Sequence, residues 1–237
     1  MAKDITDLKD KHKDKRCFVM GTGPSLQMNQ LDKLRDEITI APNGIVHAID
    51  ETGFHPTYFC SADHAMFKQP EHWNHMKQTK STRVLSDWIL LKAPQFGYKF
   101  TGEQRKFIRD SYLVKHLSPG RRTLVSKPEE ICLDLEVGTK QVGTTILDVC
   151  IPLAFYLGCN PIYIIGCDCQ MTGHFYKYKT PYERSIGKGV GMADMKVRDQ
   201  YPVFKDKFDQ ENRQLINLTP IDVSCPGIPK QSFDDII

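Results

Sequence analysis

Short runs of apolar residues recur along the chain, and amphipathic segments separate several of them. The runs lie at residues 17–20, 38–41, 56–61, 83–86, 161–166 and 215–218. Each run is long enough for one buried strand. Residues 26–36, 146–157 and 199–213 instead place their apolar side chains at helical spacing. Strands that recur with helical connections predict an α/β fold, with a mainly parallel sheet flanked by helices.

Polar residues follow the first three of these strands. A glycine-rich stretch follows the first, Asn43 the second, and Ser61, Asp63 and His64 the third. The carboxyl ends of parallel strands meet at one edge of a sheet, where ligands of open α/β sheets bind. The pattern therefore predicts a ligand site along this edge.

The glycine-rich stretch directly after the first strand is the most informative part of the chain. It reads Gly21, Thr22, Gly23, Pro24, Ser25. Glycines allow a ligand to approach the backbone closely, and a proline suits the first turn of a helix. A helix that begins there would point free N–H groups and its positive dipole end outward, which favours phosphate. The alternative is a turn that only joins a strand to a helix.

A buried helix is predicted at residues 146–157, with Pro152 as the site of a kink or irregular turn. Gly143, Thr144 and Thr145 precede it and predict a second anion-facing helix start. Alternatively, a threonine here only caps the helix, although a cap and a ligand contact are compatible.

The most apolar strand, residues 161–166, is expected at the centre of the sheet. It ends in Gly166, and Asp168 lies two residues further on. The following residues 170–198 are rich in glycine and aromatic side chains and predict a lid over the site. Its candidate functional residues are His174, Tyr176, Tyr178 and Tyr182. The alternative for this segment is a disordered surface loop.

Composition limits the possibilities further. The 237 residues suffice for one α/β domain, predicted at 16–237, after a charged and solvated leader at 1–15. A net charge of +3 is too small to argue for nucleic acid. Without a span of about 20 apolar residues or a signal-peptide core, we expect a cytoplasmic protein. The eight cysteines lack the spacing of a zinc site.

The fold of residues 92–140 is the hardest to predict from the sequence. This segment is either an inserted subregion or the flank of the sheet, with strand candidates near 98–100, 111–114 and 123–125.

Several of these motifs occur together in a known superfamily. They are F-V-M-G-T-G-P-S-L at 18–26, Asn43, G-T-T at 143–145, I-Y-I-I-G-C-D at 162–168 and I-N-L-T-P-x-x-x-S-x-P-G-I-P at 216–229. Over roughly residues 16–230 the chain resembles the superfamily of Campylobacter-type CMP-sialic-acid sialyltransferases. The same superfamily includes the motility-accessory-factor glycosyltransferases and the 6-hydroxymethylpterin pyrophosphokinase-like proteins. The resemblance implies a modified Rossmann-like fold that binds a nucleotide at the carboxyl ends of its strands.

The resemblance also implies residue roles. In the sialyltransferases the glycine loop, the following asparagine and the small residues before the buried helix contact the CMP part of the donor. These positions correspond here to the loop from Gly21 to Ser25, Asn43, Thr144 and Thr145. Lid tyrosines stabilise the departing CMP phosphate, and a lid histidine is the general base. This chain departs from the pattern there, because residues 191–195 have no histidine where the family places it. His174 and His64, or else Asp63 and Asp168, are the candidates that remain.

Three functions follow from these observations. The first is glycosyl transfer from a nucleotide-activated donor to a hydroxyl of a glycan or other acceptor. The resemblance implies a CMP-linked donor, with sialic acid or a related nonulosonic acid as the sugar. This scheme requires no cofactor, since hydroxyls and N–H groups can carry the leaving charge. The second is pyrophosphoryl transfer from ATP to a hydroxymethylpterin, with Mg²⁺ held by Asp63 and Asp168 at neighbouring strand ends. The third is a non-catalytic nucleotide-binding protein. A homo-oligomer is possible in each case.

Overall fold

The computed structural model describes residues 3–117, 124–140, 142–169, 173–176 and 197–237. Its centre is one sheet of seven parallel strands in the order β5-β4-β3-β2-β1-β6-β7. The strands are β1 (Cys17–Met20), β2 (Thr39–Pro42), β3 (Tyr58–Ser61), β4 (Thr82–Ser86), β5 (Tyr112–Val114), β6 (Ile162–Ile165) and β7 (Leu215–Asn217). The predicted α/β fold with a parallel sheet is confirmed.

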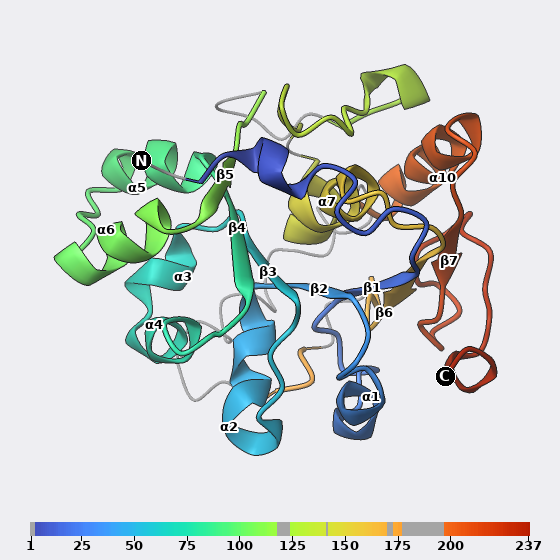
Figure 1. Cartoon of the computed structure of the whole chain (residues 1–237), viewed down its shortest axis with the longest axis horizontal. Helices are drawn as coiled ribbons and strands as arrows, with labels where there is room; N and C mark the ends of the chain where they lie inside the picture. Colours follow the sequence, from blue (N-terminus) through green and yellow to red (C-terminus); the bar gives the residue numbers. More distant parts are fainter. Residues whose placement is uncertain (1–2, 118–123, 141, 170–172, 177–196) are drawn as a thin grey trace.

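Helices cover both faces of this sheet (Figure 1). They are α1 (Met28–Lys33), α2 (Ile49–Thr52), α3 (Ala65–Lys68), α4 (Pro70–Met76), α5 (Trp88–Gln95), α6 (Gly102–Arg109), α7 (Ile151–Tyr156) and α10 (Gln200–Gln210). Shorter helical turns are η1 (Ile5–Leu8), η2 (Asn43–Ala48), η3 (Pro128–Glu130), η4 (Ile146–Cys150) and η5 (Phe233–Asp235).

Alternation along the strands divides the core into two layers, because successive strand residues point to opposite faces. Val19 of β1 packs in the layer that contains α7 and α10, with Phe204 and Phe208. Phe18 packs in the opposite layer with residues of α1 and α4, among them Leu31 and Trp73. All four residues of β1 are fully buried, as expected for a strand covered on both sides.

The region 92–140 contributes to the same sheet and does not form a separate body in its described part. The expected strand near 111–114 is β5, the edge strand next to β4. The strand candidate at 98–100 is wrong. These residues lead into helix α6, where Thr101 and Gln104 form a reciprocal capping box. The candidate at 123–125 is also wrong in its described part, since Leu124 and Val125 are not in a strand.

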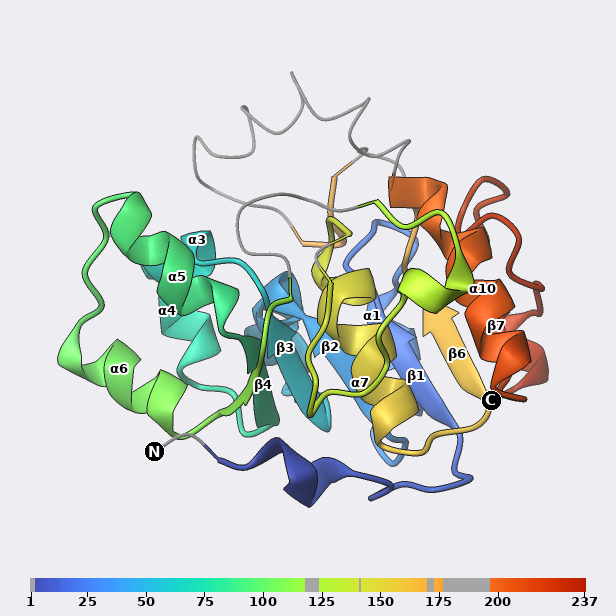
Figure 2. The same cartoon turned by 90° about the horizontal axis from the view of Figure 1, so that it is seen from above.

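The first residues are charged but attached to the domain. Leu8 is fully buried, and the backbone N–H groups of Asp10, His12 and Asp14 donate to carbonyls at the end of α7 and just after it. Figure 2 shows this segment along the edge where the strands begin, opposite the predicted ligand edge. The charged side chains of residues 9–16 are mostly exposed to solvent, as expected, but one leucine and a ladder of backbone hydrogen bonds attach the segment to the domain.

Candidate functional site

The strand order places the glycine loop at the point where the chain changes direction across the sheet. From β1 the chain moves outward through β2 to β5, then returns to place β6 on the other side of β1. In open α/β sheets, ligands bind at this switch point, beyond the carboxyl ends of the strands. The loops after β1 and β6 are therefore neighbours, although about 145 residues separate them in sequence.

Hydrogen bonds hold the glycine loop against the end of β6. Gly21 N donates to Ile165 O at 2.7 Å, and Gly23 N donates to Gly166 O at 2.8 Å. A Cβ atom on Gly21 would collide with the carbonyl of Gly166, so a larger residue does not fit there. The loop needs glycine for close packing against its own sheet, whether or not a ligand also approaches it.

Asp168 completes this attachment. Its carboxylate accepts a hydrogen bond from Ser25 N at 3.0 Å and a second, short one from the Ser25 hydroxyl. The side chain is buried, with 4% of its surface exposed. The expectation that the loop points free N–H groups outward is therefore wrong for Gly21, Gly23 and Ser25, whose N–H groups are bonded inside the protein.

At the second predicted helix start, residues 143–145, an acidic side chain again accepts backbone N–H hydrogen bonds. Asp148, in the π-helical turn η4, accepts hydrogen bonds from Val142 N at 2.7 Å and Gly143 N at 3.1 Å. Thr144 Oγ1 accepts from Leu147 N at 3.4 Å, so Thr144 caps the helix. The irregularity expected at Pro152 lies one turn earlier, in η4. Sequence reasoning did not identify Asp148 because it lies inside an apolar helix pattern.

Asn43 connects the end of β2 to this helix start. Its Nδ2 donates to Thr145 Oγ1 at 3.1 Å, and its backbone takes a left-handed φ of 36°. Its Oδ1 is buried and has no hydrogen-bond partner among the described residues. A buried acceptor without a partner costs about 1–3 kcal/mol, which a donor group on a ligand would recover.

His174 lies against the glycine loop. Its Nδ1 is 3.2 Å from Thr22 O and 3.1 Å from Thr22 Oγ1, and the adjacent Phe175 N donates to Thr22 O at 3.0 Å. A carbonyl oxygen only accepts, so the contact with Thr22 O requires the proton on Nδ1. The neutral ring then carries its basic lone pair on Nε2.

Stacked rings connect His174 to a group of histidines that sequence reasoning missed. Tyr176 lies between His174 and His47, with ring centroids 5.0 Å and 4.4 Å away. His47 Nε2 is 2.7 Å from His72 Nδ1, and the His75 ring is 4.6 Å from that of His47. Burial, reinforced by the neighbouring histidines, lowers the pKa of His47 to about 3 and that of His72 to about 4. Both rings are therefore neutral near pH 7.

The residues after β3 have local roles. Ser61 Oγ accepts from Asp63 N at 3.4 Å, and Asp63 Oδ1 accepts from Ala65 N at 2.8 Å, which caps helix α3. His64 stacks on Phe96, with centroids 5.0 Å apart. The expectation that Asp63 and Asp168 lie at neighbouring strand ends is wrong, because β2 and β1 separate β3 from β6.

A cation and a thiol lie beyond β6. A hydrogen bond from Cys225, with smaller contributions that include Arg198, lowers the pKa of the Cys169 thiol to about 7. The Nε atom of Arg198 is buried, and no group in the described part of the chain forms a hydrogen bond with it. Sequence reasoning placed the lid boundary at Arg198 but did not name this residue.

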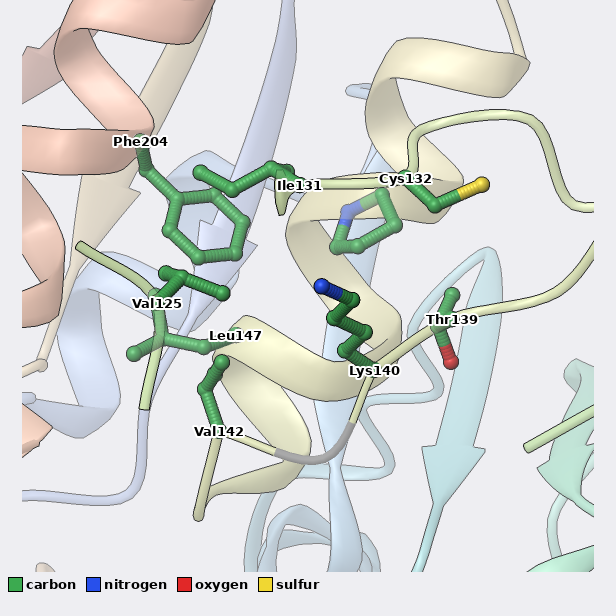
Figure 3. A pocket seen from close by; sticks show the side chains of 9 residues that line it. Val125, Ile131, Cys132, Thr139, Lys140, Val142, Leu147 and Phe204 are labelled. Carbon is green, nitrogen blue, oxygen red and sulfur yellow. The ribbon is translucent and has the colours of Figure 1, made fainter. Parts of the chain in front are cut away.

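The structure thus brings the glycine loop, Gly166, Asp168 and His174 together, and it joins Asn43 to Thr145. Tyr178 and Tyr182 lie outside the described residues. A small cavity elsewhere, between α7, α10 and residues 125–142, has a volume of about 10 Å³ (Figure 3). Val125, Leu147 and Phe204 line it, with Lys140 extending between them. It is large enough for about one water molecule and not for a nucleotide.

A comparison with protein families gives one decisive match. Residues 1–174 fit the family described as 6-hydroxymethylpterin diphosphokinase MptE-like. The chain belongs to this family. The match confirms the superfamily resemblance seen in the motifs, and it covers both the glycine loop and His174.

The fold is also similar to a solved structure, the MAf glycosyltransferase from Magnetospirillum magneticum AMB-1. The TM-score is 0.50 at 11% sequence identity, and the match covers 94% of this chain and 35% of that one. This chain therefore spans about a third of the length of that protein. The likeness confirms the Rossmann-like fold. No curated protein matches the chain in sequence. Within the described residues, no helix has the length and apolarity needed to cross a membrane.

Proposed function

We propose that this MptE-like protein is a glycosyltransferase that moves a sugar from a nucleotide-activated donor to an acceptor hydroxyl. The donor nucleotide would lie over the β1–β6 switch point. A CMP-linked donor and a nonulosonic acid sugar are the finer form of this proposal, by resemblance to the sialyltransferases. The fold shared with a MAf glycosyltransferase is consistent with it.

The contact between His174 Nδ1 and Thr22 O, 3.2 Å long, is the observation that carries this proposal. With Nδ1–H bonded to Thr22 O, the ring has a fixed orientation and its basic nitrogen is Nε2. A general base needs this arrangement, in which one nitrogen is anchored and the other accepts a proton. His174 thus replaces the family histidine that residues 191–195 lack.

Further residues have roles in the same scheme. Asn43 Oδ1, buried and unpaired, would accept a hydrogen bond from the nucleotide. The hydroxyl groups of Tyr176, Tyr178 and Tyr182 would stabilise the phosphate that leaves the sugar. Thr145 supports Asn43 from the helix start, at 3.1 Å.

The test asks which donor the protein hydrolyses and whether the hydrolysis requires a metal ion. The chelator-treated full chain is incubated with CMP-sialic acid and with ATP, each with and without Mg²⁺. Metal-independent hydrolysis of CMP-sialic acid, lost in His174→Gln while CMP still binds, supports the proposal. His64→Gln is the matched control and is expected to retain activity, because its ring stacks on Phe96 and lies beside Asp63 after β3. AMP release from ATP that depends on Mg²⁺ would overturn the proposal.

The family match favours a second candidate, Mg²⁺-dependent diphosphokinase activity on a hydroxymethylpterin. Asp168 and Asp63 offer the carboxylate oxygens that Mg²⁺ prefers. The geometry is less favourable for one shared ion, since the ends of β3 and β6 are three strand spacings, about 14 Å, apart. Asp168 would also have to give up its bonds to Ser25. In Asp168→Asn, loss of Mg²⁺-dependent activity with intact nucleotide binding would favour this candidate. Binding of nucleotide without any turnover would leave a non-catalytic protein.

A further inference from the structure

Two helical segments on one face of the sheet bring three metal-binding side chains together. His47 comes from η2, while Glu71 and His75 come from α4. Glu71 and His75 are four residues apart, so they lie on the same side of that helix. One ligand atom from each of the three residues lies within 4.8 Å of the other two.

The donor set fits a particular kind of cation. Two imidazoles and one carboxylate form the protein part of many zinc sites, in which water or substrate takes the fourth position. With bonds of about 2.0–2.1 Å to a tetrahedral ion, ligand atoms lie about 3.4 Å apart. The three side chains therefore have to close by little more than an ångström, which is within the range of rotamer adjustment. Mg²⁺ and Ca²⁺ prefer oxygen ligands and fit this set less well.

The neighbours of these histidines match the outer shell of a metal site. A ligating histidine usually uses its second ring nitrogen to bind a protein group, which fixes the tautomer. His47 Nε2 is 2.7 Å from His72 Nδ1. His75 Nδ1 is 3.2 Å from a carboxylate oxygen of Asp50, although not aligned as a hydrogen bond. His72 and Asp50 are therefore positioned as outer partners of the two candidate histidine ligands.

We propose that His47, Glu71 and His75 bind one divalent transition-metal cation of the zinc class, with His72 and Asp50 as outer partners. The ion would tie η2 to α4. It would also fix the His47 ring on which Tyr176 stacks, at a centroid distance of 4.4 Å. The proposal is independent of the transferase reaction, because its three ligands are not among the residues assigned to that chemistry.

The first experiment measures Zn²⁺ binding directly. The full chain is stripped with a chelator and titrated with ZnCl₂ by calorimetry, with a competing chelator of known affinity. We expect one site. Glu71→Gln and His75→Gln should each weaken it at least a hundredfold, while Asp50→Asn should weaken it ten- to a hundredfold as an outer partner. His55→Gln, which changes a histidine bonded to Lys80 N outside the cluster, is the matched control and should bind as the wild type does.

The eight cysteines are a competing source of ligands, so the second experiment identifies the donor atoms. Co²⁺ replaces Zn²⁺, and its absorption spectrum separates imidazole and carboxylate ligands from thiolates, which add an intense charge-transfer band in the near ultraviolet. We expect d–d bands without that thiolate band, and their loss in Glu71→Gln. Circular dichroism of each metal-free variant confirms folding, and Glu71, half-buried on α4, is the substitution least disruptive to the core. Absence of a Zn²⁺ site, equal binding by Glu71→Gln and wild type, or a thiolate spectrum would each overturn the proposal.

Discussion

The glycine loop and the histidine cluster, which consists of His47, His72 and His75, lie along the same edge of the sheet but are held in different ways. Backbone hydrogen bonds to Ile165 and Gly166 and the buried carboxylate of Asp168 fix the loop. Ring contacts among His47, Tyr176 and His174 hold the cluster. Packed backbone has few alternative positions, whereas stacked side chains can move by changing rotamer. The backbone of the glycine loop is thus the rigid side of the site, and the histidine cluster, whose side chains can change rotamer, is the adjustable side.

The difference also separates two kinds of chemistry. The N–H groups of Gly21, Gly23 and Ser25 form hydrogen bonds inside the protein. The loop therefore contributes to ligand binding mainly through its shape. The other side presents an asparagine oxygen that no described residue bonds and a histidine with an anchored Nδ1. We therefore expect the catalytic groups on the side held by ring contacts, where side chains can move slightly to fit a substrate.

The largest effect is expected from Gly21→Ala. The added Cβ meets the backbone carbonyl of Gly166, which cannot move without shifting β6. We expect a loss of about 3 kcal/mol in the free energy of unfolding, measured with urea, together with loss of nucleotide binding. The control is Gly102→Ala at the start of α6, where a Cβ meets no atom within 4 Å and the change should stay within about 0.5 kcal/mol. Equal stability of the two variants would contradict a rigid loop.

Asp168→Asn tests the same attachment through its charge. The variant keeps the size of the side chain but weakens two hydrogen bonds from Ser25 to a carboxylate. Hydrogen bonds to charged groups contribute about 1.5–3 kcal/mol, so we expect a stability loss of about 2 kcal/mol by urea unfolding. Asp63→Asn, which alters one half-buried hydrogen bond at the start of α3, should cost about 1 kcal/mol or less. A larger loss in Asp63→Asn would show that the loop does not depend on Asp168.

Gly44→Ala tests the adjustable side. Here the added Cβ meets the Tyr176 hydroxyl, the far end of a side chain that can turn away. We expect a stability loss below about 1 kcal/mol, in contrast to Gly21→Ala, and a lower rate of donor hydrolysis as the Tyr176 stack shifts. Unfolding and hydrolysis measured on the same preparation separate the two effects. A stability loss as large as that of Gly21→Ala would remove the distinction between the two regions.

The smallest effect concerns reactivity and not stability. Since the pKa of Cys169 is lowered to about 7, its thiolate fraction should rise through half at about pH 7, and alkylation by iodoacetamide should follow that curve. Cys225→Ala removes the main cause and should move the midpoint toward the ordinary thiol value near 9. Cys17 is the internal control, because burial raises its pKa and should keep it unreactive over this range. Peptide mass spectrometry resolves the sites.

The sequence predicted the fold in its main features, because a buried strand can be recognised from the apolar residues within a short segment. Each of the six runs predicted as a strand contains one, and β1 begins and ends where the pattern places it, at Cys17 and Met20. Helix α6 was missed, since its short amphipathic segment follows aromatic residues that resemble a strand. The glycine loop was located correctly but its hydrogen bonding was not, because the partners Ile165, Gly166 and Asp168 belong to a strand far away in the sequence.

The histidine cluster shows the limit of reading a sequence. The spacing of Glu71 and His75, four apart on a helix, was the available signal, and without a third ligand it is weak. His47 joins them only when η2 packs beside α4.

By itself, then, the chain determined its strands, the parallel sheet and the polar edge, since these follow from the order of apolar and polar residues. Only the tertiary structure decided which polar groups form hydrogen bonds inside the protein and which face a ligand. That outcome depends on contacts between distant segments, which periodicity along the chain does not encode.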